Sequence, residues 1–182
     1  ALASDTPLAL VPSTDTNGHG TFLAGIAAGG SLPAQDFTGA APESELVVVK
    51  LKPAKQYLRD FYLVRSDAEA YQENDIMMGI KYLRVEAYSQ RKPLDVLLGI
   101  GSNLGSHEGT SPLNVMIQDI SRNLGMATVI AAGNETGRGH HYMGSVPMGE
   151  ESVDVEIRVG NAESQRGFVV ELWAATADTY SV

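Results

Sequence analysis

The stretch from Asp15 to Gly29 constrains the fold of this chain more than any other. It begins with turn-forming residues, Asp-Thr-Asn-Gly-His-Gly-Thr, and continues as a helical segment of small residues. Gly20, Ala24, Gly25, Ala27 and Ala28 carry almost no side-chain bulk, so a helix here can approach its neighbours at backbone distance. The composition of this stretch therefore predicts a central, buried helix.

His19 stands at the predicted start of that helix, between two glycines. The positive end of a helix dipole favours a neutral imidazole, which is the form that accepts a proton. His19 is therefore a candidate general base. Considered alone, it is more readily explained as a structural histidine.

Composition limits the classes of function. The chain has 182 residues, enough for one domain or for part of a larger one, and a net charge of −9 without any cluster of Lys or Arg. Nucleic acids and anionic membranes are therefore not expected as partners. The chain has no cysteine, which excludes disulfides, thiolate metal sites and a cysteine nucleophile, and it contains no apolar run of membrane-spanning length. Because it starts at Ala1, we expect a processed or excised piece of a longer polypeptide.

Three continuous apolar runs predict buried strands of a mainly parallel sheet. They cover residues 46–51, 95–101 and 126–132, and are rich in Val, Ile and Leu. Apolar residues at helical spacing predict an amphipathic helix over 73–91, and a second helix is expected over 112–123. Residues 53–72 read as an irregular covering loop rather than a substrate-contacting one. The fold class predicted is α/β, with helix layers on both sides of the sheet.

Two of these strands end in residues that could bind a ligand. Gly99, Ile100 and Gly101 leave backbone N–H and C=O groups open to an added peptide strand, although a tight turn without a ligand would use the same residues. Asn134 follows Gly133 at the end of the third run, where asparagine is commonly just a turn former.

Two further polar groups invite a catalytic reading and are better explained otherwise. Ser111 precedes a proline, which is typical of the N-cap of a helix beginning at Pro112. His140 and His141 are adjacent, with no third ligand at regular spacing, so we expect a solvated loop, no metal site and no cofactor.

The pattern changes beyond residue 150. Apolar residues alternate with charged ones over 153–159, a turn follows, and residues 168–173 form a second apolar run. This pattern predicts an antiparallel β-hairpin that opens a separate β unit. We therefore expect two domains, at residues 1–150 and 151–182.

Several of these segments together resemble the subtilisin-like serine proteases, the subtilases. The segments are His-Gly-Thr-x-x-Ala-Gly-x-x-Ala from His19, Gly-Ala-Ala-Pro-x-Ser-Glu-Leu-Val-Val-Val-Lys from Gly39, and Val-Ile-Ala-Ala-Gly-Asn-Glu ending at Glu135. The resemblance covers roughly residues 13–150. With the β segment after Asn134, it is greatest to the clostridial spore-germination (Csp-type) subtilases, which carry an inserted jelly-roll domain before the serine.

The resemblance implies serine endopeptidase activity on a peptide or protein substrate, in a three-layer αβα fold. His19 would be the general base, Asn134 the oxyanion donor, and Asp15 a loop residue rather than the triad acid. Gly99, Ile100 and Gly101 would bind the extended peptide, and Ala131, Ala132 and Gly133 would form the wall of the specificity pocket. A secreted or spore-associated bacterial location would follow from the same resemblance.

The chain departs from the subtilase pattern at two places. The segments of the catalytic aspartate and serine are absent, since neither Asp5 nor Ser111 stands in the expected context. Two hypotheses follow: a protease fragment that needs the remaining segments of its own precursor, or a non-catalytic peptide-binding pseudoprotease. Retention of both His19 and Asn134 favours the first.

Overall fold

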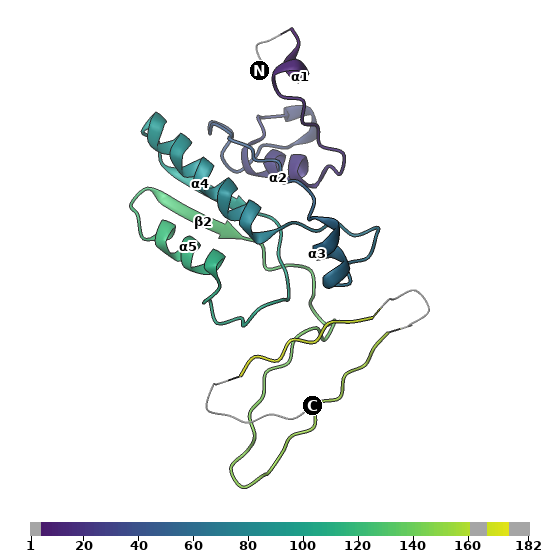
Figure 1. Cartoon of the computed structure of the whole chain (residues 1–182). Helices are drawn as coiled ribbons and strands as arrows, with labels where there is room; N and C mark the ends of the chain where they lie inside the picture. The colour runs from purple at the N-terminus through teal and green to yellow at the C-terminus, as the bar shows by residue number, and fades with distance from the viewer. Residues whose placement is uncertain (1–4, 161–166, 175–182) are drawn as a thin grey trace. The chain divides into compact units, whose positions relative to one another are not determined.

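The computed structural model describes residues 5–160 and 167–174. It divides into two units, Ala1–Leu51 and Lys52–Val182, and each is described by itself. The first unit contains α1 (Pro7–Leu10), α2 (His19–Ala28) and the 3₁₀ helix η1 (Pro33–Gln35). The second contains α3 (Gln56–Phe61), α4 (Glu73–Gln90), β1 (Leu94–Leu98), α5 (Pro112–Ser121) and β2 (Met126–Ile130) (Figure 1).

The second unit is built on a parallel pair of strands with two helices. β1 and β2 pair in parallel, with Leu94 opposite Met126 and Leu98 opposite Ile130, and α5 is the crossover between them. α4 and α5 contact each other, and each contacts a strand of the pair (Figure 1). The core centres on three almost fully buried residues, one each from α4, β1 and α5: Ile80, Val96 and Ile120.

The helices begin and end where the sequence predicts. α4 follows the apolar spacing expected over 73–91 and ends at Gln90. The next residue, Arg91, adopts a left-handed conformation two residues before Pro93. α5 begins at Pro112, a residue suited to the first helical position, after the N-cap Ser111. Both helices are therefore confirmed to within one or two residues.

The sheet of the second unit has one covered and one exposed face. Side chains alternate along β1, so that Val96 is buried against the helices while Leu97 remains 45% exposed. Val129 of β2 is likewise exposed. The α/β class with a parallel sheet is confirmed. Within the described part of this unit, helices cover only one of its two faces.

In the first unit, α2 is packed against the returning chain by backbone hydrogen bonds. The N–H groups of Gly39, Ala40 and Ala41 donate to the carbonyls of Gly29, Ile26 and Ala27 at 2.8–2.9 Å. A Cβ atom at Gly39 would lie 2.4 Å from the backbone nitrogen of Gly29. The small residues therefore serve a close backbone approach, as their composition predicts.

Two expectations for the first unit are wrong. Helix α2 was expected to be buried, but none of its residues is, and Phe22 is 64% exposed. The run 46–51 was expected to be a buried strand, but it forms no strand and Val48 is 74% exposed. A strand requires a paired neighbour, and the first unit contains only an isolated bridge between Leu32 and Phe37 among its described residues.

The remaining differences lie in the second unit. Residues 53–72 were expected to be irregular but include α3, in which Gln56 donates to Asp60 one turn on. The described residues 153–160 and 167–174 form no strand ladder, and the predicted turn lies largely in 161–166, outside the described residues. The hairpin, the jelly-roll insertion and the boundary at residue 150 therefore stay predictions.

Candidate active site

The turn before α2 is organised by the carboxylate of Asp15. Its Oδ1 accepts from the backbone N–H groups of Asn17 (2.9 Å) and Gly18 (2.8 Å). Its Oδ2 accepts from the Thr21 hydroxyl at 2.6 Å and from the Thr21 N–H at 3.1 Å. Four donors on one carboxylate close the loop over the first turn of the helix. This supports a loop role for Asp15.

These hydrogen bonds also determine the charge of Asp15. The Thr21 hydroxyl, followed by the N–H groups of Gly18, Asn17 and Thr21, holds the pKa of Asp15 well below its ordinary value. The negative charge lies at the N-terminal end of α2, where the helix dipole favours an anion. The turn is therefore built around a carboxylate that is ionised at neutral pH.

His19 is the first residue of α2 and its side chain is exposed. Its backbone N–H donates to Asn17 Oδ1 at 3.1 Å. Gly18 before it has φ +90°, a left-handed conformation that glycine adopts without strain. Lys50 Nζ donates to the Thr14 carbonyl at the start of the turn. The turn thus presents the imidazole at the surface of the first unit.

In the second unit, the ends of the two strands bring the candidate peptide-binding segments together. Leu98 and Ile130 are opposite each other, and the N–H of Ala131 extends the ladder to the Leu98 carbonyl at 3.0 Å. Residues 99–101 and 131–134 therefore leave the same carboxyl edge of the parallel pair. This is the edge at which open α/β sheets bind ligands.

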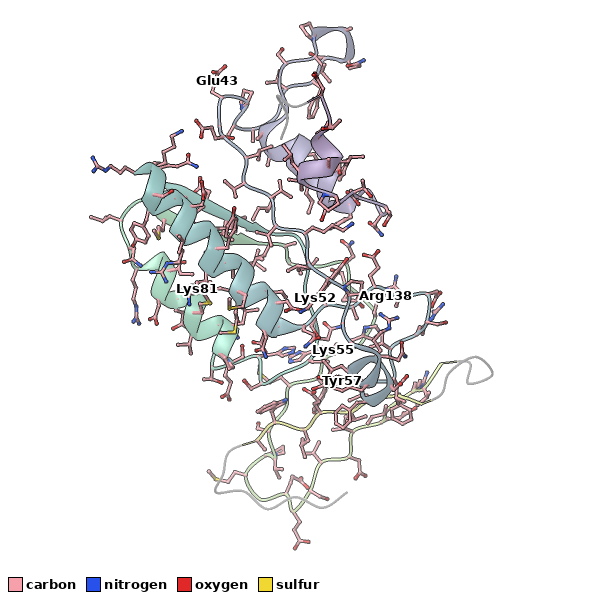
Figure 2. All side chains as sticks on the ribbon, turned by 45° about the horizontal axis from the view of Figure 1, so that its top comes forward. Glu43, Lys52, Lys55, Tyr57, Lys81 and Arg138 are labelled. Carbon is pink, nitrogen blue, oxygen red and sulfur yellow. The ribbon has the colours of Figure 1, made fainter. Side chains whose placement is uncertain are left out.

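Asn134 lies one residue beyond a left-handed glycine. Gly133 has φ +85°, so the chain turns there and Asn134 is exposed. The following turn is closed by a hydrogen bond from the Arg138 N–H to the Glu135 carbonyl, 3.0 Å long; Arg138 is labelled in Figure 2. The amide of Asn134 thus lies at the sheet edge, outside any strand.

Ser111 caps a helix, as its sequence context predicts. Its Oγ accepts from the N–H of Asn114 at 3.3 Å. Its hydroxyl also donates to Glu73 Oε1 (3.3 Å), which accepts from the Leu113 N–H at 3.1 Å. Glu73, at the start of α4, therefore holds the start of α5. Sequence reasoning missed this role, because the two residues are far apart in the chain.

The first turn of α4 also holds the segment before α3. Lys52, labelled in Figure 2, forms an ion pair with Asp75 at 3.2 Å. The N–H of Lys55 donates to Gln72 Oε1 at 3.4 Å. A cavity of about 980 Å³ is lined by residues between Pro53 and Tyr71 and by Gly167.

His140 and His141 each have a partner. His140 Nδ1 lies 2.7 Å from Glu135 Oε2, and the His141 ring stacks on that of His107. Among the described residues, no group of three or more His, Cys, Asp or Glu is arranged to hold a metal ion. In the same part of the chain, every helix is too short or too polar to cross a membrane.

The predicted site residues thus fall in both units. The turn of His19 belongs to the first unit, while Gly99–Gly101 and Ala131–Asn134 share one sheet edge in the second. The subtilase resemblance also predicts that His19 and Asn134 face one cavity; this stays a prediction, because the two residues belong to different units.

Comparison with known proteins assigns the chain to a family. The model of the subtilase family, Peptidase S8, matches residues 5–165. The chain belongs to the subtilases, which are serine-type peptidases acting on peptides or proteins.

A solved structure points to one branch of that family. The chain is similar to the CspB protease of Clostridium perfringens, with 33% sequence identity and a TM-score of 0.59. The match covers 74% of this chain and 26% of that protein, so the chain spans about a quarter of its length. The similarity to a Csp-type subtilase is therefore shown. No curated protein matches the chain significantly.

Proposed function

We propose that this chain carries the histidine base, the oxyanion donor and part of the peptide-binding edge of a Csp-type subtilisin-like endopeptidase. The family match over residues 5–165 supports a protease-like function. The observation that carries the finer proposal is the parallel register ending at Leu98 and Ile130, which brings Gly99–Gly101 and Asn134 to one edge.

In this proposal the peptide substrate adds as an extended strand along Gly99, Ile100 and Gly101. A serine attacks the scissile carbonyl, and His19 takes its proton and returns it to the leaving amine. The Asn134 amide donates to the oxyanion, an interaction worth about 10²–10³ in kcat in subtilisin. Ala131, Ala132 and Gly133 line the wall of the specificity pocket.

The aspartate and the serine are proposed to come from segments outside these 182 residues. Within the chain, Asp15 is committed to the turn and Ser111 to the cap of α5. Neither is therefore offered as a member of the triad. The precursor is proposed to hold an aspartate upstream of Ala1 and a serine downstream of Val182.

A fluorophosphonate probe, which reacts with activated serines, tests the proposal. The purified 182-residue chain should take up no probe, while the longer precursor should be labelled stoichiometrically. His19→Ala in the precursor should lower kcat by about the 10⁶-fold that loss of this residue costs subtilisin. Ser111→Ala is the matched control and should keep the labelling.

Two outcomes would contradict the proposal. Labelling of the isolated chain would mean that the nucleophile lies within it. An unlabelled precursor that still binds peptides would favour the non-catalytic pseudoprotease.

A further inference from the structure

Two stacked histidine side chains join the two loops that leave the carboxyl edge of the sheet, and a third histidine lies beside them. The rings of His107 and His141 stack with centroids 4.6 Å apart and planes inclined by 8°. Beside them, Asn103 Nδ2 lies 3.5 Å from His140 Nδ1, and the same ring nitrogen lies 2.7 Å from Glu135 Oε2. The stacked pair of His107 and His141 thereby joins residues 102–109 to residues 135–141.

His107 is held in a backbone conformation that histidine adopts only at some cost. Its φ is +56°, in the left-handed region where glycine is the ordinary residue. Its Nε2 donates to the carbonyl of Asn103 at 2.8 Å, which closes the loop and fixes the tautomer. A strained residue whose side chain makes two specific contacts is a sign that the contacts matter.

Glu135 and His140 close the other loop. Glu135 directly follows Asn134, and its carboxylate accepts from His140 Nδ1 while its carbonyl accepts from the Arg138 N–H. The shorter contact of His140, to Glu135, assigns the ring proton to Nδ1, so this nitrogen does not accept a hydrogen bond from Asn103 Nδ2, which only lies near it. The direction of the chain after Asn134 therefore depends on this pair.

The first loop has a further anchor in the region after residue 150. The N–H of Gly105 donates to Glu171 Oε2 at 2.7 Å, and the indole N–H of Trp173 donates to the same oxygen at 3.2 Å. The loop 102–109 is thus fixed by contacts from two segments that follow it in the chain.

We propose that His107, His140 and His141, with Glu135, form a histidine clamp of positioning residues. The clamp fixes the spacing between the peptide-binding edge Gly99–Gly101 and the oxyanion donor Asn134. This inference rests on the proposed function. The side chains of His140 and Glu135 are 53% and 48% exposed, so the clamp acts by geometry, not by excluding water.

The two ends of the clamp should affect different kinetic constants of the active precursor. His107→Gly removes the ring but suits the left-handed backbone, and should raise KM about tenfold because the peptide-binding edge loses its support. His140→Ala should lower kcat about tenfold with little change in KM, because it acts on the residue beside Asn134. Glu108→Gln, in the same loop but outside the clamp, is the control and should change neither.

Rescue separates stacking from folding. His107→Phe keeps an aromatic ring, so its KM should return most of the way from the raised value of His107→Gly to that of the wild type. Thermal melts should show every variant folded at the assay temperature, so that the rise of KM in His107→Gly and its reversal in His107→Phe do not reflect unfolding. If the wild-type precursor is active while His107→Gly and His140→Ala keep its KM and kcat, the clamp is overturned.

NMR of the 182-residue chain tests the clamp independently of catalysis. Cross-peaks between the ring protons of His107 and His141 should be present in the wild type, and their absence would overturn the clamp. An inactive precursor with these cross-peaks intact would refute the proposed function while supporting the clamp geometry.

Discussion

The two units of this chain are stabilised by different forces. In Lys52–Val182, apolar side chains from α4, α5, β1 and β2 pack into a core around Ile80, Val96 and Ile120. In the described residues 5–51, Gly39 is the only buried residue, and order comes from backbone hydrogen bonds and the Asp15 carboxylate. A pattern of apolar side chains therefore specifies the second unit, whereas a motif of particular polar and small residues specifies the first.

The largest effect is expected in the core of the second unit. Ile120 is 0% exposed, so Ile120→Ala should lower the free energy of unfolding by about 2–5 kcal/mol. Phe22→Ala, at an exposed position of α2, should change it by no more than about 0.5 kcal/mol. Urea denaturation of both variants measures the difference. Equal losses would show that the two units share one apolar core.

An intermediate effect is expected from adding a methyl group to the first unit. Gly39→Ala would place a Cβ 2.4 Å from the Gly29 nitrogen, and should cost about 1–3 kcal/mol in the stability of α2. Hydrogen exchange of the Ala40 and Ala41 amides, which bond to α2, measures this opening. Gly30→Ala is the control, because its Cβ would meet nothing within 4 Å. Unchanged exchange in Gly39→Ala would contradict the close approach.

The smallest change in the stability of the chain is expected from protonation of Asp15. Its pKa is depressed in the folded state, so its contribution to stability is complete above the unfolded value of about 3.9 and is lost as the pH falls toward the folded value. The amide signals of Asn17, Gly18 and Thr21 should therefore stay constant from pH 5 to below 3.9 and move only at lower pH. NMR titration measures this.

Asp15→Asn provides the reference for that titration, since its amide signals should be independent of pH over the whole range. A midpoint near 3.9 in the wild-type chain would contradict the four hydrogen bonds to the carboxylate.

Apolar spacing predicted the helices of the second unit well because each helix buries one face. The apolar runs 95–101 and 126–132 predict buried strands, but only one face of each is covered, and Leu97 and Val129 are exposed. The spacing of Ile76, Ile80 and Leu83 defines α4, and the apolar runs define β1 and β2 with ends that differ by three residues or fewer. Apolar character alone gave a wrong prediction at residues 46–51, which form no strand, because a strand also requires a partner for its backbone groups.

In the candidate site, features set by local sequence could be predicted, and contacts between distant residues could not. The turn around His19, the cap at Ser111 and the segments at the strand ends follow from local sequence. The contacts of Glu73 with Ser111, and of His107 with His141, join residues that are far apart in the chain, and no local pattern specifies such pairs. The burial of α2 was also predicted wrongly, since small residues permit close approach without specifying what approaches.

The crossover from β1 through α5 to β2 has a consequence for the order of folding. Among the residues that the structure describes, the core around Ile80, Val96 and Ile120 is built from one continuous stretch of chain, Ile76 to Met126. The entropy cost of closing a loop of this modest length is small compared with the free energy gained by burying its apolar surface. During synthesis, this nucleus can begin to pack once β2 has left the ribosome, before the segments that follow Asn134 are available. The later segments would then dock onto a sheet edge that already exists.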